Sequence, residues 1–152
     1  MTDLPLILLV EDNKDDYEAA FRSLRKNNFA NPIHWCPSGQ AALDFLYRRG
    51  EYEDAGQLDR PGLIMLDLNM PGIDGRQVLE TIKGDAELRS IPIVVLTTSA
   101  DPGDVEKCYD SGASTYIQKP VSFEALTEAI GTMKDYWFRV AILPKHSMKS
   151  GR

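Results

Sequence analysis

Carboxylates follow two apolar runs of the sequence at the point where each run ends. Glu11 and Asp12 come directly after the run LILLV, and Asp67 comes directly after LIML. An apolar run bounded by turn-forming residues is typical of a strand buried on both faces of a parallel sheet. Because ligands of open parallel sheets bind beyond the carboxyl ends of the strands, we expect these acids to meet at one edge. An aspartate after a strand is also a common turn residue, so Asp67 taken alone is equally well explained by the turn that follows it.

Three carboxylates at one edge repel one another, and either protonation or a cation relieves the repulsion. In a solvent-accessible cleft at neutral pH we expect a hard divalent cation. Magnesium takes one or two carboxylates and keeps several waters. We therefore predict that Asp12 and Asp67 bind Mg²⁺ directly, while Glu11 holds a metal-bound water. The backbone carbonyl of Asn69 is expected to fill a further position.

Two other strand ends add a hydroxyl and an ammonium. The run Ile93 to Leu96 ends at Thr97, and the run Thr115 to Gln118 ends at Lys119. Together with Mg²⁺ these groups suit a phosphoryl group, whose transfer needs neutralisation of oxygen charge and in-line positioning. We predict that Asp67 attacks phosphorus and becomes an aspartyl phosphate, with Thr97 and Lys119 binding the remaining oxygens.

The elements that must position these groups alternate between strand and helix. Leu6 to Val10 and Ile33 to Cys36 complete the set of predicted strands. Apolar residues at helical spacing predict helices from Asp15 or Asp16 to about Asn27, from Pro37 through Tyr47, around Val78 to Ile82, from Asp101 to about Ser111, and from Ser122 through Trp137. This order predicts a parallel sheet covered on both faces and joined by right-handed crossovers. Gly50 to Pro61 is expected to be a surface loop.

Length and composition describe an ordinary globular chain. The 152 residues are 43% hydrophobic, which suits one domain with its own core. The net charge of −6 argues against nucleic-acid binding. The apolar runs are far shorter than the roughly 20 residues of a membrane span, so we expect a cytoplasmic protein that does not enter membranes. Cys36 and Cys108 are expected to be free thiols.

The motifs of the chain resemble the receiver domain of bacterial two-component response regulators. They are VEDN at 10–13, LDLNMPGIDG at 66–75, LTTS at 96–99, GAS at 112–114 and YIQKP at 116–120, and the resemblance runs from about Leu6 to Met133. It implies a doubly wound, flavodoxin-like α/β fold, with a five-stranded parallel sheet in the order 2-1-3-4-5 and five flanking helices. It also implies that Asp67 accepts phosphate from a histidine kinase, with Glu11 and Asp12 as the acid pair.

The same resemblance implies a switch. Thr97 is expected to move toward the phosphate, Tyr116 to turn inward, and the Lys119–Pro120 bond to be cis. The sequence departs from the common pattern at Thr98, where a small residue is usual, and this side chain is expected to narrow access to the phosphate.

Three features are similar to the stand-alone regulators that partner bacterial phytochrome kinases: FLYRRGEY, the long loop after it, and the ending YWFRVAILP. On this resemblance the partner is a phytochrome histidine kinase. We expect a receiver domain over residues 4–137 and a C-terminal extension and tail over 138–152. Because exposed apolar patches mark interfaces, the last two helices and this extension are expected to form a homodimer.

Two alternatives remain open. A magnesium-dependent phosphohydrolase of the haloacid dehalogenase type also forms an aspartyl phosphate, but those enzymes carry a second aspartate two residues after the nucleophile, where this chain has Asn69. A phosphorylation-independent receiver scaffold is expected to have lost the acids or Lys119, and this sequence keeps them. We favour a phosphoacceptor signalling protein, which catalyses only its own phosphorylation and dephosphorylation.

Overall fold

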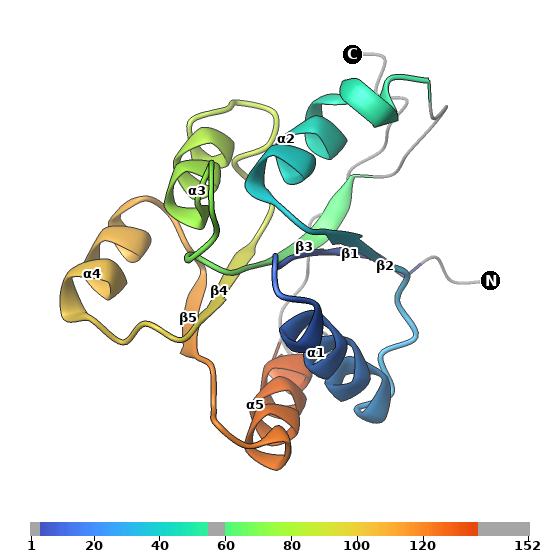
Figure 1. Ribbon diagram of the computed structural model, residues 1–152, viewed down its shortest axis with the longest axis vertical. Coiled ribbons are helices and arrows are strands. Elements are labelled where there is room, and N and C mark those ends of the chain that lie inside the picture. Colours follow the sequence, from blue (N-terminus) through green and yellow to red (C-terminus); the bar gives the residue numbers. More distant parts are fainter. Residues whose placement is uncertain (1–3, 55–59, 137–152) are drawn as a thin grey trace.

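The computed structural model of the chain describes residues 4–54 and 60–136. Strands and helices alternate along it (Figure 1): β1 Leu6–Val10, α1 Lys14–Lys26, β2 Ile33–Cys36, α2 Gly39–Tyr47, the short 3₁₀ helix η1 Gly50–Tyr52, β3 Pro61–Leu66, α3 Gly75–Lys83, β4 Ile93–Thr97, α4 Pro102–Asp110, β5 Thr115–Gln118 and α5 Phe123–Asp135. Among the described residues, no helix is both long enough and apolar enough to span a membrane.

The five strands form one parallel sheet in the order β2-β1-β3-β4-β5, as predicted. Helices cover both faces (Figure 1), with α1 and α5 on one and α2, α3 and α4 on the other. Successive side chains of β3 point to opposite faces. Leu63 and Met65 therefore join the core under α1 and α5, whereas Ile64 and Leu66 join the core under α2 and α3. Burial on both faces fixes the end of this strand in place.

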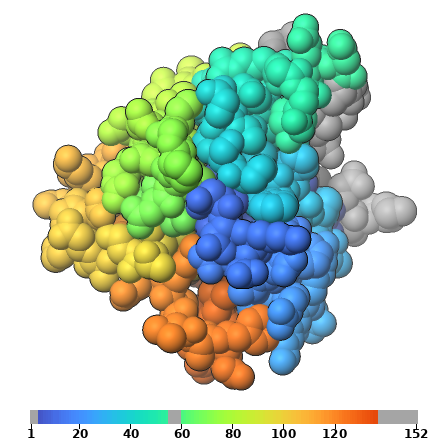
Figure 2. All heavy atoms as spheres, viewed as in Figure 1, coloured from blue at the N-terminus to red at the C-terminus, as the bar shows by residue number. Residues whose placement is uncertain are grey.

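Side-chain caps define where the helices begin. Asn13 caps α1 by accepting a hydrogen bond from the Asp16 N–H, so α1 starts at Lys14, slightly before the predicted start. Ser122 caps α5 by accepting from the Ala125 N–H, which confirms the predicted cap. The first and last helices lie side by side, as the blue and orange atoms in Figure 2 show.

Two expectations from the sequence are wrong. The described residues contain no cis peptide bond, so Lys119–Pro120 is trans. The trans form is the lower in free energy for X-Pro. The Lys119 N–H donates to the Thr97 carbonyl at 2.6 Å. The segment from Gly50 to Pro61 was expected to be a surface loop, but the structure places a short helix at its start and the first residue of β3 at its end. This helix is η1, whose Tyr52 is buried, and the Tyr52 hydroxyl lies 2.8 Å from Nε2 of His34.

Several expectations lie outside the described residues. These are the conformation of residues 55–59, the apolar ending from Trp137 onward, and the homodimer that this ending was expected to form. The expectation of free thiols is confirmed, since Cys36 and Cys108 are both unpaired and buried.

Candidate functional site

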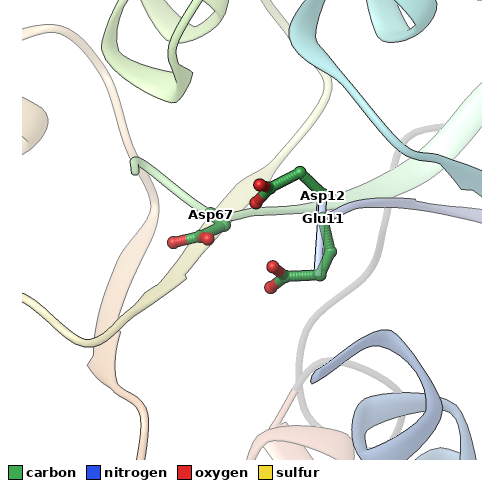
Figure 3. A group of neighbouring side chains, drawn as sticks. All are labelled: Glu11, Asp12 and Asp67. Atoms are coloured by element: carbon green, nitrogen blue, oxygen red, sulfur yellow. The ribbon is translucent and has the colours of Figure 1, made fainter. Parts of the chain in front are cut away.

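The three predicted acids come together at the carboxyl ends of β1 and β3 (Figure 3). Glu11, Asp12 and Asp67 each offer a carboxylate oxygen, and these atoms all lie within 4.8 Å of one another. Glu11 and Asp67 are buried, whereas Asp12 is exposed. Two groups are thus held inside the protein and one reaches solvent. Among the described residues this is the one group of three acids, cysteines or histidines close enough to hold a metal ion.

The backbone around Asp67 is fixed from two sides. Its N–H donates to the Val10 carbonyl of β1 at 3.1 Å, which continues the strand pairing to the site. Gly75, the first residue of α3, passes so close that a Cβ there would lie 2.1 Å from the Asp67 carbonyl oxygen. Only glycine permits this approach, which brings α3 back under the acid.

Lys119 reaches the acids from the end of β5. Its ammonium donates to Glu11 Oε1 at 2.6 Å and to Asp16 Oδ2 at 2.9 Å, and it lies 3.6 Å from Asp67 Oδ2. The sequence predicted that Lys119 faces the phosphoacceptor. It did not predict Asp16, because a contact between residues 103 positions apart leaves no periodic signal. In this structure Lys119 is bonded to Glu11 and Asp16 and is only near Asp67.

The charges in this site do not balance. Burial raises the pKa of Glu11 to about 7, and the nearby charge of Asp67 adds to the effect, while the hydrogen bond from Lys119 opposes it. Burial lowers the pKa of Lys119, but its hydrogen bonds to Glu11 and Asp16 outweigh this and the net pKa is raised. One ammonium thus serves several carboxylates. The oxygen donors and the excess of negative charge suit a hard divalent cation.

Thr97 ends β4 beside these acids and is fully buried. Its hydroxyl oxygen accepts a hydrogen bond from the Asn69 side-chain amide at 3.3 Å, and the Asn69 N–H lies 3.4 Å from Asp67 Oδ1. Asn69 thus connects the predicted phosphoacceptor to the predicted switch threonine. The proposed role of its carbonyl in metal binding stays a prediction.

A second polar group of residues surrounds the loop between β4 and α4. The Tyr116 hydroxyl donates to the Ser99 carbonyl at 2.9 Å, and the Ser99 hydroxyl donates to Asp104 Oδ2 at 2.8 Å. Arg76 of α3 binds Asp104 through Nε at 2.9 Å and Nη2 at 2.8 Å. Sequence reasoning singled out Tyr116 but missed Arg76 and Asp104, because the pair joins two helices that the sequence does not place together.

The fold and the acidic strand ends define the class of protein, a doubly wound α/β domain of the flavodoxin-like receiver type. The model of the response regulator receiver domain matches residues 7–131, and the chain belongs to this family of signalling proteins.

Relatives agree with this assignment. The chain is 39% identical over 132 residues to the probable methanogenesis regulatory protein FilR2 of Methanothrix harundinacea, with 87% of this chain and 83% of that protein covered. It is 37% identical over 139 residues to response regulator Rcp1 of Synechocystis, with 91% and 92% covered. The crystal structure of the Mn²⁺-bound form of Rcp1 matches 93% of this chain and 99% of that chain with a TM-score of 0.84. The bacteriophytochrome response regulator AtBRR, 38% identical, matches 95% and 100% with a TM-score of 0.73.

Proposed function

We propose that this chain is a phosphoacceptor that takes a phosphoryl group on Asp67 from a phytochrome histidine kinase and signals through a change of its surface. The observation that carries the proposal is the gathering of Glu11, Asp12, Asp67 and Lys119 at adjoining strand ends, with Asp67 buried but next to an exposed acid. Two similar structures support the choice of kinase, since one is of the cyanobacterial phytochrome response regulator RcpA and the other is of the bacteriophytochrome response regulator AtBRR.

The transfer needs one nucleophile and little other protein chemistry. An Asp67 carboxylate oxygen attacks phosphorus and forms a P–O bond, while the P–N bond of the donor phosphohistidine breaks and its electron pair returns to the imidazole nitrogen. Lys119 and the Thr97 hydroxyl bind phosphoryl oxygens. Charge neutralisation at these oxygens is the main contribution of the protein.

The proposed cofactor is Mg²⁺, which when bound neutralises charge on the carboxylates and on the phosphoryl oxygens. Asp12 and Asp67 would be its direct ligands, Glu11 would hold a bound water, and the Asn69 carbonyl would supply a further oxygen. The cluster of oxygen donors within 4.8 Å fits a small divalent cation. The existence of an Mn²⁺-bound form of Rcp1 supports binding of a divalent ion, and we propose that the ion in this chain is Mg²⁺.

The proposed signal runs through Thr97 and Tyr116. A phosphoryl group on Asp67 attracts the Thr97 hydroxyl, which then leaves Asn69. Tyr116 responds because its hydroxyl is bonded to Ser99, two residues beyond Thr97 in the same loop. The Tyr116 side chain is half-buried and packs against the core. A shift of Ser99 therefore moves the Tyr116 side chain, and this movement changes the exposed surface of α4 and β5.

Intact-mass measurement after incubation with acetyl phosphate and Mg²⁺ tests the proposal. We expect a gain of one phosphoryl group that is lost in Asp67→Asn and in EDTA and retained in the control Asp110→Asn, which removes an exposed carboxylate at the end of α4. Labelling without a divalent ion would contradict the metal assignment. No mass gain would favour a phosphorylation-independent scaffold, and multiple-turnover release of phosphate from small esters would favour a phosphohydrolase.

We also propose that residues 4–137 form the receiver domain, that residues 138–152 form an extension, and that the extension and the last helices make a homodimer in the cytoplasm. Sedimentation of the full chain and of a chain truncated after Tyr136 tests the dimer. A dimer that survives the truncation would contradict a role for the extension.

A further inference from the structure

Lys119 has three ammonium donors, and two of them are bonded in this structure to residues other than the phosphoacceptor. The bonds go to Glu11 Oε1 at 2.6 Å and to Asp16 Oδ2 at 2.9 Å. The nearest oxygen of Asp67 lies 3.6 Å from the same nitrogen, beyond hydrogen-bond distance. Two carboxylates thus compete with Asp67 for the ammonium of Lys119.

The Asp16 side chain is much more exposed to solvent than the Glu11 side chain. The Glu11 side chain is 5% exposed, whereas the Asp16 side chain is 45% exposed. Breaking the Glu11 bond would leave a buried carboxylate without its ion-pair partner and with only the hydrogen bond from the Asn13 N–H at 3.1 Å, which is unfavourable. Breaking the Asp16 bond returns its carboxylate to water, which costs little. Asp16 is therefore the partner that Lys119 can leave.

The position of Asp16 is fixed by the start of α1. Its backbone N–H donates to the Asn13 side chain at 2.9 Å, so the first turn of the helix carries the carboxylate to the end of β5. Figure 2 shows this first turn, in blue, on the surface of the molecule, consistent with the exposure of Asp16. A fixed, half-exposed carboxylate can hold the ammonium without enclosing it.

We propose that Asp16 is a positioning residue that restrains Lys119 in the unphosphorylated protein and releases it when a phosphoryl group occupies Asp67. This inference rests on the proposed function and deepens it. Because the Asp16 bond stabilises only the unphosphorylated state, Asp16 weakens the binding of a phosphoryl group. The restraint sets how readily the domain changes state, although Asp16 itself does not touch the reacting atoms.

Binding of beryllium trifluoride, an analogue of the phosphoryl group, tests the proposal in the full chain with saturating Mg²⁺. Asp16→Asn is expected to bind the analogue about two- to fivefold more tightly than the unchanged chain, the range expected for loss of a half-exposed ion pair. Titration calorimetry gives the affinity. Steady-state phosphorylation by acetyl phosphate, read by intact mass, should rise in parallel. Asp16→Glu keeps a carboxylate and is expected to restore most of the restraint.

Asp15→Asn is the matched control. Asp15 lies in the same first turn of α1 and is exposed, and the ion pairs of Lys119 within the described ranges do not include it. The control loses the same charge and the same favourable interaction with the helix N-terminus, but not the contact with Lys119. Equal affinities of Asp16→Asn and Asp15→Asn, or weaker binding by Asp16→Asn, would overturn the inference.

The result also separates this inference from the proposed function. If the unchanged chain neither binds the analogue nor gains a phosphoryl group, the proposed function fails. If the unchanged chain does both and the two aspartate variants agree, only the role of Asp16 fails. Circular dichroism establishes that the variants fold, and Asp16→Ala replaces Asp16→Asn if the amide disturbs the helix start.

Discussion

The end of β3 and the corner formed by the β4–α4 loop, α4 and β5 are built on different principles. All six residues of β3 are buried, and its side chains join both cores. No residue of β5 is fully buried, and the buried residue of α4 is Cys108 alone. The corner is held by polar contacts instead, from Tyr116 through Ser99 and Asp104 to Arg76.

The difference indicates which part of the molecule can move. Rearranging an apolar core leaves cavities or clashes that cost several kcal/mol. A hydrogen bond at a half-exposed position contributes only about 0.5 to 1.5 kcal/mol, and water can replace it. We therefore expect β3 to keep Asp67 in place while the corner changes its contacts in response to phosphorylation.

Truncation of an apolar side chain should give the largest difference in stability between the two regions. Leu66 is fully buried next to Asp67, whereas Ile117 of β5 is only partly buried. We expect Leu66→Ala to lower the free energy of unfolding by about 2 to 5 kcal/mol. Ile117→Ala should lower it by less, because its site is already open to water. Urea denaturation measures both, and equal losses would show that the two regions are held alike.

Divalent metal should stabilise the folded protein through the acids at the ends of β1 and β3. Mg²⁺ at about 100 times its dissociation constant is expected to add roughly 2.7 kcal/mol to the free energy of unfolding, because it binds the folded state alone. The gain should disappear in Asp12→Asn, which removes an exposed predicted ligand, and persist in Asp110→Asn. Thermal unfolding with and without Mg²⁺ provides the measurement. Stabilisation that survives in Asp12→Asn would place the ion elsewhere.

Removing one polar contact should loosen the corner while leaving β3 unaffected. Tyr116→Phe deletes the hydroxyl that donates to Ser99 at 2.9 Å. We expect a loss of about 0.5 to 1.5 kcal/mol in the free energy of unfolding. Amide exchange should quicken in the β4–α4 loop and remain unchanged in β3. Faster exchange along β3 would contradict a corner that moves on its own.

The smallest expected effect is a pH dependence of the corner. Hydrogen bonds from Arg76, and then from Ser99, lower the pKa of Asp104 to about 2. A lowered pKa in the folded state stabilises the protein above the ordinary pKa near 3.8, and this stabilisation is lost as pH falls through 2. The difference in unfolding free energy between the unchanged chain and Asp104→Asn should therefore shrink between pH 5 and pH 2.5. A constant difference would exclude this titration.

Much of the fold follows from local pattern. Apolar runs such as Leu6 to Val10 predicted the strands, because a strand buried on both faces must be apolar throughout. Ser122 predicted the start of α5, because a hydroxyl there satisfies a free N–H of the helix. Lys119–Pro120 was expected to be cis and is trans. The free-energy difference between the cis and trans forms is small for any X-Pro bond, so the surrounding contacts decide which form is present.

The sequence alone was enough to place polar groups at the ends of the strands, since the predicted strands end at or next to Glu11 with Asp12, Asp67, Thr97 and Lys119. Only the tertiary structure decided how these groups share their charges. Lys119 is bonded to Glu11 and Asp16 instead of Asp67, and Arg76 holds Asp104. Such partners depend on distances between elements far apart in the chain, and neither spacing nor periodicity encodes those distances.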